Sequence, residues 1–170
     1  GEGDEPLSQP HPVTLDLGSG MVFQLQGRID RLDQTPHGCC VVDYKTGRPY
    51  QENRSGPYDR GRHLQHALYA LAAQQLLGQE AVRSEYYFTH PQATSPWLEY
   101  LPPERDPLRQ VLELVLHPLA AGAFVHSDDQ ANDCRFCSFR NACTSHQDGP
   151  VRAKLKSPLL RARRQLLEEA

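Results

Sequence analysis

Two aspartates and one lysine have the types and spacing that metal-assisted hydrolysis of a phosphodiester bond needs. Asp30 lies in the segment GRIDRLD of residues 27–33, and Asp43 and Lys45 lie in the segment VVDYKTG of residues 41–47. If these segments form a hairpin that turns between Pro36 and His37, Asp30 faces Asp43 with Cβ atoms roughly 5 Å apart. Two carboxylates that close repel each other unless a cation lies between them or one is protonated. Their oxygens suit Mg²⁺ or Mn²⁺, which also take water and substrate phosphate as ligands.

Strand alternation places Lys45 on the same face as Asp43. From there its ammonium can stabilise charge that develops on a phosphate, or help to deprotonate a metal-bound water. The carbonyl of Tyr44 is a candidate for the third metal ligand. The alternative interpretation is a solvent-facing hairpin in which Lys45 only pairs with Asp43, the usual explanation of an isolated D-x-K. The hairpin geometry and the apolar run that leads into the motif favour the metal site.

A second metal site is indicated by Cys134, Cys137 and Cys143, which follow each other with a CxxC-x₅-C spacing in a polar segment. The five cysteines are an odd number without a secretory signal, which argues against disulfides and for an intracellular metal site. Together with His146 the triplet makes a complete Cys₃His set for tetrahedral zinc. Spacing alone favours zinc and an iron–sulfur cluster equally.

The alternation of polar and apolar residues, and the turn-forming residues between these stretches, predict the elements that position the site residues. Strands are expected over residues 13–17, 21–32, 39–45, 82–90 and 97–101, with a turn at 18–20, a polar break at 33–38 and a loop at 48–61. A helix is expected from about Arg62 to Leu77, with Gly78 ending it. Its buried stripe is expected to consist of Leu64, Ala67, Leu68 and Leu71.

A second helix is expected to start at Asp106-Pro107, and Pro118 should kink or end it. Its inward residues are expected to be Leu108, Val111, Leu112 and Val115. The order of strands, helix, strands and helix predicts an α/β or α+β fold with a mixed sheet.

Composition fits one folded domain with a small appendage. The chain has 170 residues, of which 38% are hydrophobic and 23% charged. No apolar run approaches the roughly 20 residues that span a bilayer, so we expect a cytoplasmic protein with no membrane partner. The net charge of -3 gives no overall sign of nucleic-acid binding. Six cations without an intervening acid nevertheless form a basic tail, which is either a DNA-binding segment or a solvated helix: Arg152, Lys154, Lys156, Arg161, Arg163 and Arg164.

At these motifs the chain resembles the PD-(D/E)xK nuclease superfamily, in particular its RecB-like branch. That branch has a G-x-[IV]-D-R-[IVL]-D strand, a D-Y-K-T-G strand and then a helix with Q-x-x-x-Y. Residues 27–33 and 43–47 match the first two, and Gln65 and Tyr69 supply the third. Residues four apart share a helix face, so both are expected to reach toward the metal site. The alternative is that they are ordinary helix-flank residues.

The resemblance implies a restriction-endonuclease-like core, a central mixed sheet flanked by helices, and a Mg²⁺-dependent DNA exonuclease. The expected partners are single-stranded or unwound DNA and a helicase domain or subunit, in bacterial recombination and repair. The expected organisation is an extended lead-in at residues 1–12, the nuclease core at 13–132, the cysteine segment at 133–147 and the basic tail at 148–170.

The chain departs from the family pattern in two places. Family members carry a metal-binding His on a helix well upstream of the first Asp, whereas here His11 lies between two prolines and is not assigned that role. AddB-type subunits and related CRISPR-associated exonucleases hold a [4Fe–4S] cluster with such a cysteine triplet and one distant upstream cysteine. That cysteine has no match, because Cys39 and Cys40 fall in the predicted strand beside the site. The chain is therefore expected to be a fragment, and the resemblance favours iron–sulfur over zinc in the full protein.

Two other classes of function are consistent with parts of the sequence. A non-catalytic DNA-binding or scaffolding module would keep the fold, but the intact Asp30, Asp43 and Lys45 argue against it. A zinc-ribbon interaction protein would leave the Asp and Lys motif unexplained.

Overall fold

The computed structural model describes residues 9–47, 57–124, 134, 137–139, 154 and 156–168. The chain divides into two compact units, Gly1–Arg109 and Gln110–Ala170. The first unit contains all the strands that the structure describes, and it holds the candidate active site.

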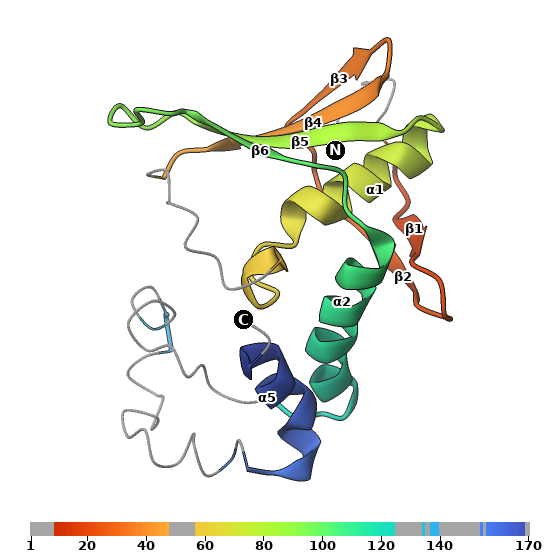
Figure 1. Ribbon diagram of the computed structural model, residues 1–170, viewed down its shortest axis with the longest axis vertical. Coiled ribbons are helices and arrows are strands. Elements are labelled where there is room, and N and C mark those ends of the chain that lie inside the picture. The colour runs from red at the N-terminus through yellow and green to blue at the C-terminus, as the bar shows by residue number, and fades with distance from the viewer. Residues whose placement is uncertain are drawn as a thin grey trace. The chain divides into compact units, whose positions relative to one another are not determined.

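A mixed four-stranded sheet forms the centre of the first unit, in the order β3-β4-β5-β6 (Figure 1). The strands are β3 (Arg31–Thr35), β4 (Gly38–Lys45), β5 (Ala81–Phe88) and β6 (Trp97–Tyr100). β4 and β5 are parallel, whereas both edge strands are antiparallel to their neighbours. Helix α1 (Gln65–Leu77) connects the two parallel strands and packs against both of them. This architecture confirms the predicted α/β class of the restriction-endonuclease-like type.

The β3–β4 hairpin has the register that the sequence predicts. Thr35 pairs with Gly38 across a two-residue turn, and the ladder continues to Arg31 opposite Val42. Gly38 has a φ of +138°, and a Cβ at this position would lie 2.2 Å from the Glu80 carbonyl oxygen. Only glycine fits there without moving the backbone. The predicted polar break at 33–38 was too long, because β3 continues to Thr35.

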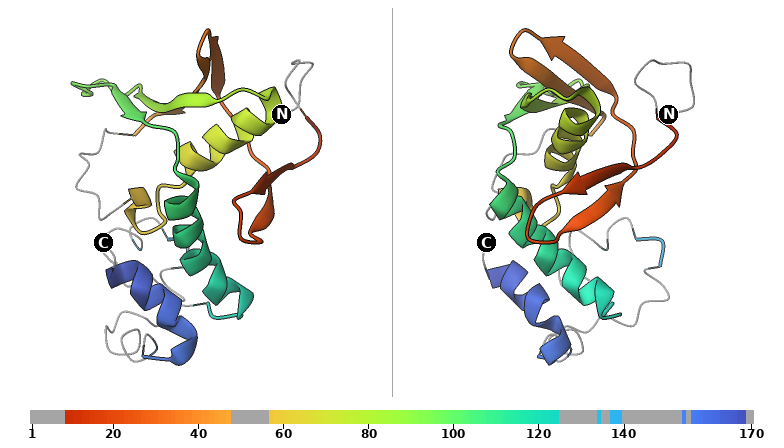
Figure 2. Two further views of the ribbon diagram at one scale, coloured as in Figure 1. Left: turned by 45° about the vertical axis from the view of Figure 1, so that its right-hand side comes forward. Right: turned by 90° about the vertical axis from the view of Figure 1, so that its right-hand side faces the viewer.

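The single strand predicted over residues 21–32 is wrong. Residues Val13–Asp16 (β1) and Val22–Leu25 (β2) form a separate two-stranded antiparallel sheet, and the chain then leaves the ladder before β3 begins. In this break a Cβ on Gly27 would lie 2.9 Å from the Tyr69 hydroxyl, so the backbone passes directly against α1. Close packing against the helix therefore interrupts a segment whose alternation of polar and apolar residues predicts one continuous strand. β1 also contacts α1, and both views of Figure 2 show the β1–β2 hairpin beside the helix.

Helix α1 begins three residues later than predicted and ends where predicted. Four consecutive residues before it, at positions 58–61, have positive φ angles, so the chain cannot enter a right-handed helix there. At the other end Gly78 adopts a left-handed conformation and its N–H donates to the Gln74 carbonyl.

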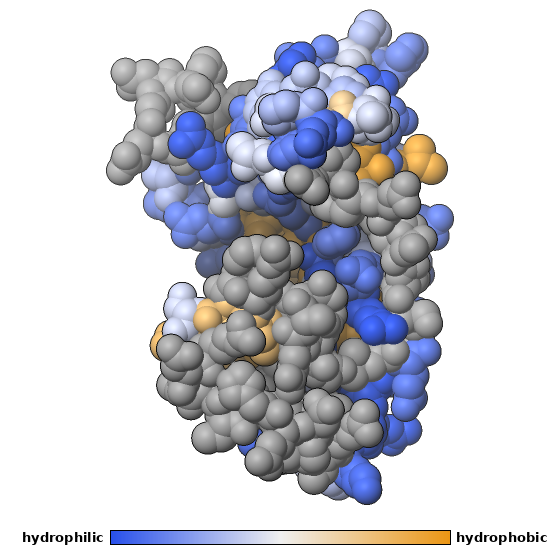
Figure 3. Space-filling model, turned by 90° about the vertical axis from the view of Figure 1, so that its left-hand side faces the viewer, coloured by the Kyte–Doolittle hydropathy of each residue, from blue (hydrophilic) through white to orange (hydrophobic). Residues whose placement is uncertain are grey.

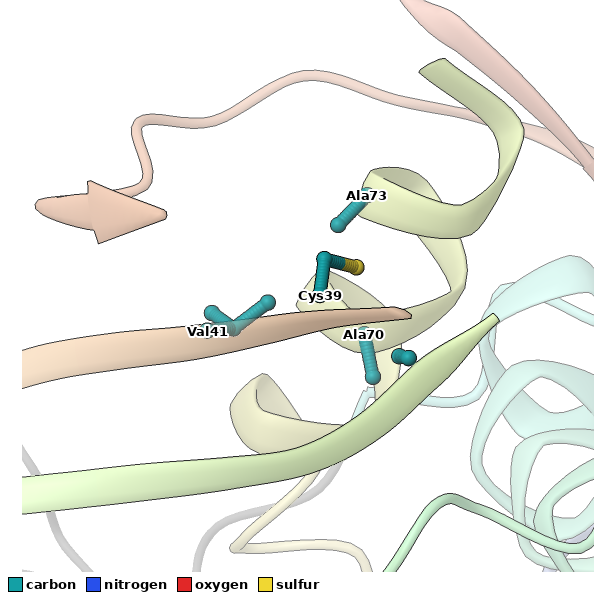
Figure 4. Packing of buried hydrophobic residues seen from close by; sticks show 5 residues of the cluster. Cys39, Val41, Ala70 and Ala73 are labelled. Carbon is teal, nitrogen blue, oxygen red and sulfur yellow. The ribbon is translucent and has the colours of Figure 1, made fainter. Parts of the chain in front are cut away.

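The buried face of α1 differs from the predicted leucine stripe. Leu64 and Leu68 are only partly buried, and the fully buried residues are mostly alanines: His66, Ala67, Ala70, Leu71, Ala72 and Ala73. Ala70 and Ala73 pack onto Cys39 and Val41 of β4 (Figure 4). Small side chains let the helix approach the sheet closely, which shortens the distance from the helix to the end of β4.

Among the described residues, helices α2 and α5 follow the sheet. α2 (Arg105–Ala120) begins one residue before the predicted start, with Leu108 and Leu112 buried. Pro118 lies in its last turn, and the helix ends two residues later, as a proline there predicts. In the second unit a 3₁₀ turn, η2 (Pro158–Leu160), leads into α5 (Arg161–Glu168).

On the face that Figure 3 draws, most of the described residues are hydrophilic, in agreement with a mean hydropathy of -0.63 for the chain. Among the residues that the structure describes, no helix combines the length and apolar character that crossing a membrane requires.

Candidate active site

Asp43 is the buried carboxylate of the site. It lies near the end of β4 with 6% of its surface exposed, on the face that α1 covers. Its Oδ1 accepts a hydrogen bond of 2.9 Å from Nε2 of Gln65, and its Oδ2 pairs with Nζ of Lys45 at 2.5 Å. A buried carboxylate needs such partners, because leaving one unpaired is costly.

Lys45 closes a triangle with Asp43 and Gln65. Its Nζ donates to Oε1 of Gln65 at 2.6 Å as well as pairing with Asp43, and it lies 4.5 Å from the centre of the Tyr86 ring. Two of the three ammonium donors are therefore directed at protein oxygens. The Lys45 side chain is 28% exposed, so the ammonium is held in place but can still be reached by a ligand.

Asp30 lies one position before β3, next to the last rung of the hairpin. Its Oδ2 accepts a hydrogen bond of 3.0 Å from the backbone N–H of Tyr44. This N–H points toward β3. If the ladder continued by one residue pair, Asp30 would therefore lie opposite Asp43 in a non-hydrogen-bonded pair. In antiparallel sheets the Cα atoms of such pairs are closer than those of hydrogen-bonded pairs. The structure thus brings Asp30 to the strand end that carries Asp43 and Lys45.

The Tyr44 backbone faces Asp30. In an extended strand the N–H and C=O of one residue point to the same side, so the Tyr44 carbonyl also points toward β3. The next carbonyl, of Lys45, points the other way and accepts from the N–H of Thr89 at 2.9 Å. The side chain of Tyr44 lies on the sheet face opposite α1, away from the triangle.

Gln65 and Tyr69 occupy different places. Gln65, the first residue of α1, bridges Asp43 and Lys45 as described above. Tyr69 lies one turn further along, against Gly27 and the cluster that contains Ile29. Its ring therefore lies against the segment that leads into Asp30. The predicted role of Tyr69 at the metal site stays a prediction.

Tyr86 is a residue of the site that the sequence did not predict. It is the Cα partner of Asp43 on β5, it is buried, and its ring lies beneath the Lys45 ammonium. Tyr100 packs against it edge-on with ring centres 5.1 Å apart. No local signal identifies it, because the parallel pairing of β4 with β5 is made across the whole of α1.

Two thiols lie upstream of Asp43 on the same strand. Cys39 and Cys40 are almost completely buried, and burial raises the pKa of both thiols above the ordinary value of 9.0. In Cys40 a hydrogen bond with Arg83 opposes part of this increase. Both thiols therefore stay protonated near neutral pH, which does not suit them as metal ligands.

The oxygens of Asp30, Asp43 and Tyr44 make a donor set that fits Mg²⁺ or Mn²⁺. Within the described ranges no group of three or more His, Cys, Asp or Glu side chains is arranged to hold a metal ion. Two carboxylates and one carbonyl are the ligand types of a hard cation that keeps several waters.

The cysteine segment is only partly described. Cys134 and Cys137 are free thiols, and the Cys137 N–H donates to the Cys134 carbonyl at 3.3 Å. Cys143 and His146 lie outside the described residues, so the predicted iron–sulfur or zinc site stays a prediction.

Comparisons with known proteins agree with this geometry. The family model of the PD-(D/E)XK nuclease superfamily matches residues 2–144. Comparison with curated proteins and with solved structures gave no significant match.

Proposed function

Because this chain belongs to the PD-(D/E)XK nuclease superfamily, we propose that it is a Mg²⁺-dependent deoxyribonuclease domain of a RecB- or AddB-like helicase–nuclease. The observation that carries the proposal is the triangle of Asp43, Lys45 and Gln65 beside Asp30. Such a domain would hydrolyse unwound DNA in bacterial recombination and repair.

Asp30, Asp43 and the Tyr44 carbonyl would hold the cation. A bound Mg²⁺ or Mn²⁺ supplies Lewis-acid polarisation of the phosphate and a lowered pKa for a coordinated water. Asp30 is oriented for this task by the Tyr44 N–H, which binds one carboxylate oxygen. Asp43 is oriented by Gln65 and Lys45 in the same way.

Lys45 would act on the scissile phosphate. During hydrolysis water adds to phosphorus, the bond to the leaving sugar oxygen breaks, and that oxygen takes up a proton. Negative charge grows on the non-bridging oxygens in the transition state, where a fixed ammonium stabilises it most. Asp43, Gln65 and the Tyr86 ring hold the Lys45 ammonium before substrate arrives, so little reorganisation is needed.

Gln65 and Tyr69 would act on the protein side of the site. Gln65 fixes the separation of Asp43 and Lys45 because its amide bonds to both. Tyr69 holds the backbone at Gly27, three residues before Asp30.

The cysteine segment would bind a [4Fe–4S] cluster in the full-length protein through Cys134, Cys137 and Cys143, with zinc on these residues and His146 as the alternative. The backbone hydrogen bond from Cys137 to Cys134 supports a shared ligand, because it holds these two residues close together. The helicase partner and the cluster belong to this proposal and not to the comparison.

A matched pair of asparagine substitutions on the hairpin tests the proposed function. Asp30→Asn removes a proposed metal ligand, whereas Asp33→Asn removes a half-exposed carboxylate that pairs with Arg31 on the other sheet face. With a labelled single-stranded oligonucleotide and Mg²⁺, we expect Asp30→Asn to lose roughly 100- to 1000-fold in cleavage rate and Asp33→Asn to stay within a fewfold. Equal rates for both variants would contradict the metal role. DNA binding by the unsubstituted protein without any cleavage would favour the non-catalytic module.

A further inference from the structure

Three aromatic side chains form a row across the sheet face opposite α1. Tyr44 on β4, Tyr87 on β5 and Trp97 on β6 are Cα partners in the ladders, so they occupy one rung. The rings of Tyr44 and Tyr87 meet edge-on with centres 5.9 Å apart, and those of Tyr87 and Trp97 lie 4.4 Å apart at 49°. We call these three residues the aromatic row.

The aromatic row is exposed, unlike the apolar residues next to it. Tyr44 is 43% exposed and Trp97 is 47% exposed, whereas Val42 on the same face is 1% exposed. Val42 lies between Arg31 and Glu85, its partners on the neighbouring strands, and each of these belongs to an ion pair along its own strand. Paired charges therefore cover this face except at the end where the aromatic row lies.

The aromatic row begins at the candidate active site. Tyr44 stands between Asp43 and Lys45 in β4, and its backbone N–H binds Asp30. The Tyr44 ring lies on the opposite sheet face from the triangle, so a polynucleotide whose phosphate reaches the active site would meet the ring by passing over this strand end. The position of an exposed aromatic surface at the strand end that also carries the proposed phosphodiester-cleaving residues favours a nucleic acid as the occupant.

We propose that the aromatic row binds unpaired bases of single-stranded DNA by stacking, and that it guides the strand to the active site. This inference rests on the proposed nuclease function. Unpaired bases expose the faces that aromatic side chains stack on, whereas bases in a duplex are already stacked on each other. Three adjacent strands place Tyr44 and Trp97 about 10 Å apart, which corresponds to about three nucleotides at the spacing of a stacked strand.

Charges near the aromatic row set the direction of the strand. On the next rung Glu85, which pairs with Arg83, faces the exposed Glu99, so a phosphate backbone that ran down the sheet from Tyr87 and Trp97 would meet a net negative charge. At the other end of the row the nearest charge is the half-exposed Arg31, which pairs with Asp33 and lies opposite Val42, two residues before Tyr44. The DNA is therefore expected to cross the strands along the aromatic row and not to run parallel to them.

The single tryptophan gives a direct test, because Trp97 is the only one in the chain. The chain is titrated with a dT oligonucleotide and with a duplex of equal length, in Ca²⁺ in place of Mg²⁺ to prevent cleavage. We expect the single strand to quench Trp97 fluorescence and the duplex to quench it much less. The unsubstituted protein suffices for this measurement, so it does not depend on a variant that folds.

Substitutions then measure the contribution of each ring to affinity. Tyr44→Leu and Trp97→Leu should weaken binding of a labelled dT oligonucleotide, followed by anisotropy, by about 5- to 150-fold. Tyr44→Phe keeps a ring and should bind within twofold of the unsubstituted protein. The matched control is Leu101→Ala, which shortens another exposed apolar side chain just beyond β6 and should leave affinity unchanged.

Each contrary outcome overturns the inference in a recognisable way. If anisotropy shows that the oligonucleotide binds while Trp97 fluorescence stays constant, the aromatic row lies outside the DNA interface. If the leucine variants unfold at lower temperature but keep their affinity, the rings only stabilise the sheet through cross-strand pairing. If Trp97 fluorescence changes with protein concentration and not with DNA, a second copy of the chain covers the row.

A cleavage assay of the same protein in Mg²⁺ separates this inference from the proposed function. Mg²⁺-dependent cleavage by a protein whose Trp97 does not respond to DNA would leave the nuclease proposal intact and overturn the aromatic row alone. Quenching of Trp97 by single strands, without any cleavage in Mg²⁺, would leave the aromatic row intact and overturn the nuclease proposal.

Discussion

Replacing Lys45 with Met removes the ammonium and keeps a side chain of similar length. The change leaves Oδ2 of Asp43 without its cationic partner at 2.5 Å, while Gln65 can still bind Oδ1. The substitution should therefore lower the stability of the metal-free protein and also the rate of cleavage. These two effects can be measured separately.

The cost in stability follows from burial. Removing one partner of a fully buried pair costs roughly 3 to 5 kcal/mol, because a charge is left without compensation. Asp43 is nearly buried but the Lys45 side chain is 28% exposed, so we discount this for solvent screening to about 2 kcal/mol. For a chain of this size such a loss lowers the melting temperature by about 4 to 8 °C. Added Mg²⁺ should restore part of the stability by supplying a cation to Asp43.

The cost in rate is expected to be larger. Loss of one preorganised electrostatic group typically lowers the rate roughly 100- to 1000-fold. Affinity for DNA should change little, because it depends on many scattered phosphate contacts. Lys45→Arg should not restore the rate, since a wide planar guanidinium replaces a compact ammonium poorly in a site bounded by Gln65 and the Tyr86 ring.

The assay combines single-turnover cleavage of a labelled oligonucleotide with thermal unfolding in the presence and absence of Mg²⁺. Arg83→Met serves as the control, because it removes an arginine that pairs with Glu85 on β5 but is 47% exposed. Arg83→Met should lower the free energy of unfolding by less than about 1 kcal/mol and leave the cleavage rate within a fewfold of that of the unsubstituted protein. Cleavage by Lys45→Met within threefold of the unsubstituted protein would refute the role assigned to the lysine, whatever happens to stability.

Four other measurements test features of the fold and of the cysteines. Gly38→Ala should destabilise the protein by at least about 2 kcal/mol in urea unfolding, since its Cβ would collide with the Glu80 carbonyl; a change below about 0.5 kcal/mol would contradict the geometry of the hairpin. The thiols of Cys39 and Cys40 should react with a thiol reagent only after unfolding, whereas exposed Cys137 reacts at once. Because burial raises the pKa of the two buried thiols above 9.0, their contribution to the free energy of unfolding is complete below pH 9 and should decline at higher pH; a stability that rises there would contradict it. Full-length protein prepared without oxygen should be brown and contain iron and sulfide, and stoichiometric zinc without visible absorbance would favour the Cys₃His site instead.

Local sequence determined the hairpin and the face that carries the carboxylate and the lysine. Pro36 and His37 form the two-residue turn, and a turn of that length leaves one register for the strands that it joins. The alternation of side chains along β4 then places Asp43 and Lys45 on one face, because the period of a strand is two residues. The end of α1 is also determined locally, because Gly78 adopts a left-handed backbone conformation.

Tertiary structure alone decided how the site is closed. The parallel pairing of β4 with β5 puts Tyr86 under the ammonium, and the alanine face of α1 brings Gln65 within hydrogen-bonding distance of Asp43 and Lys45. The packing of Gly27 against Tyr69 ends the first sheet and starts the second, although the sequence between them keeps a strand-like alternation. These features depend on contacts between segments about 20 to 40 residues apart, whose energies depend on shape complementarity and not on the period or turn chemistry of either segment.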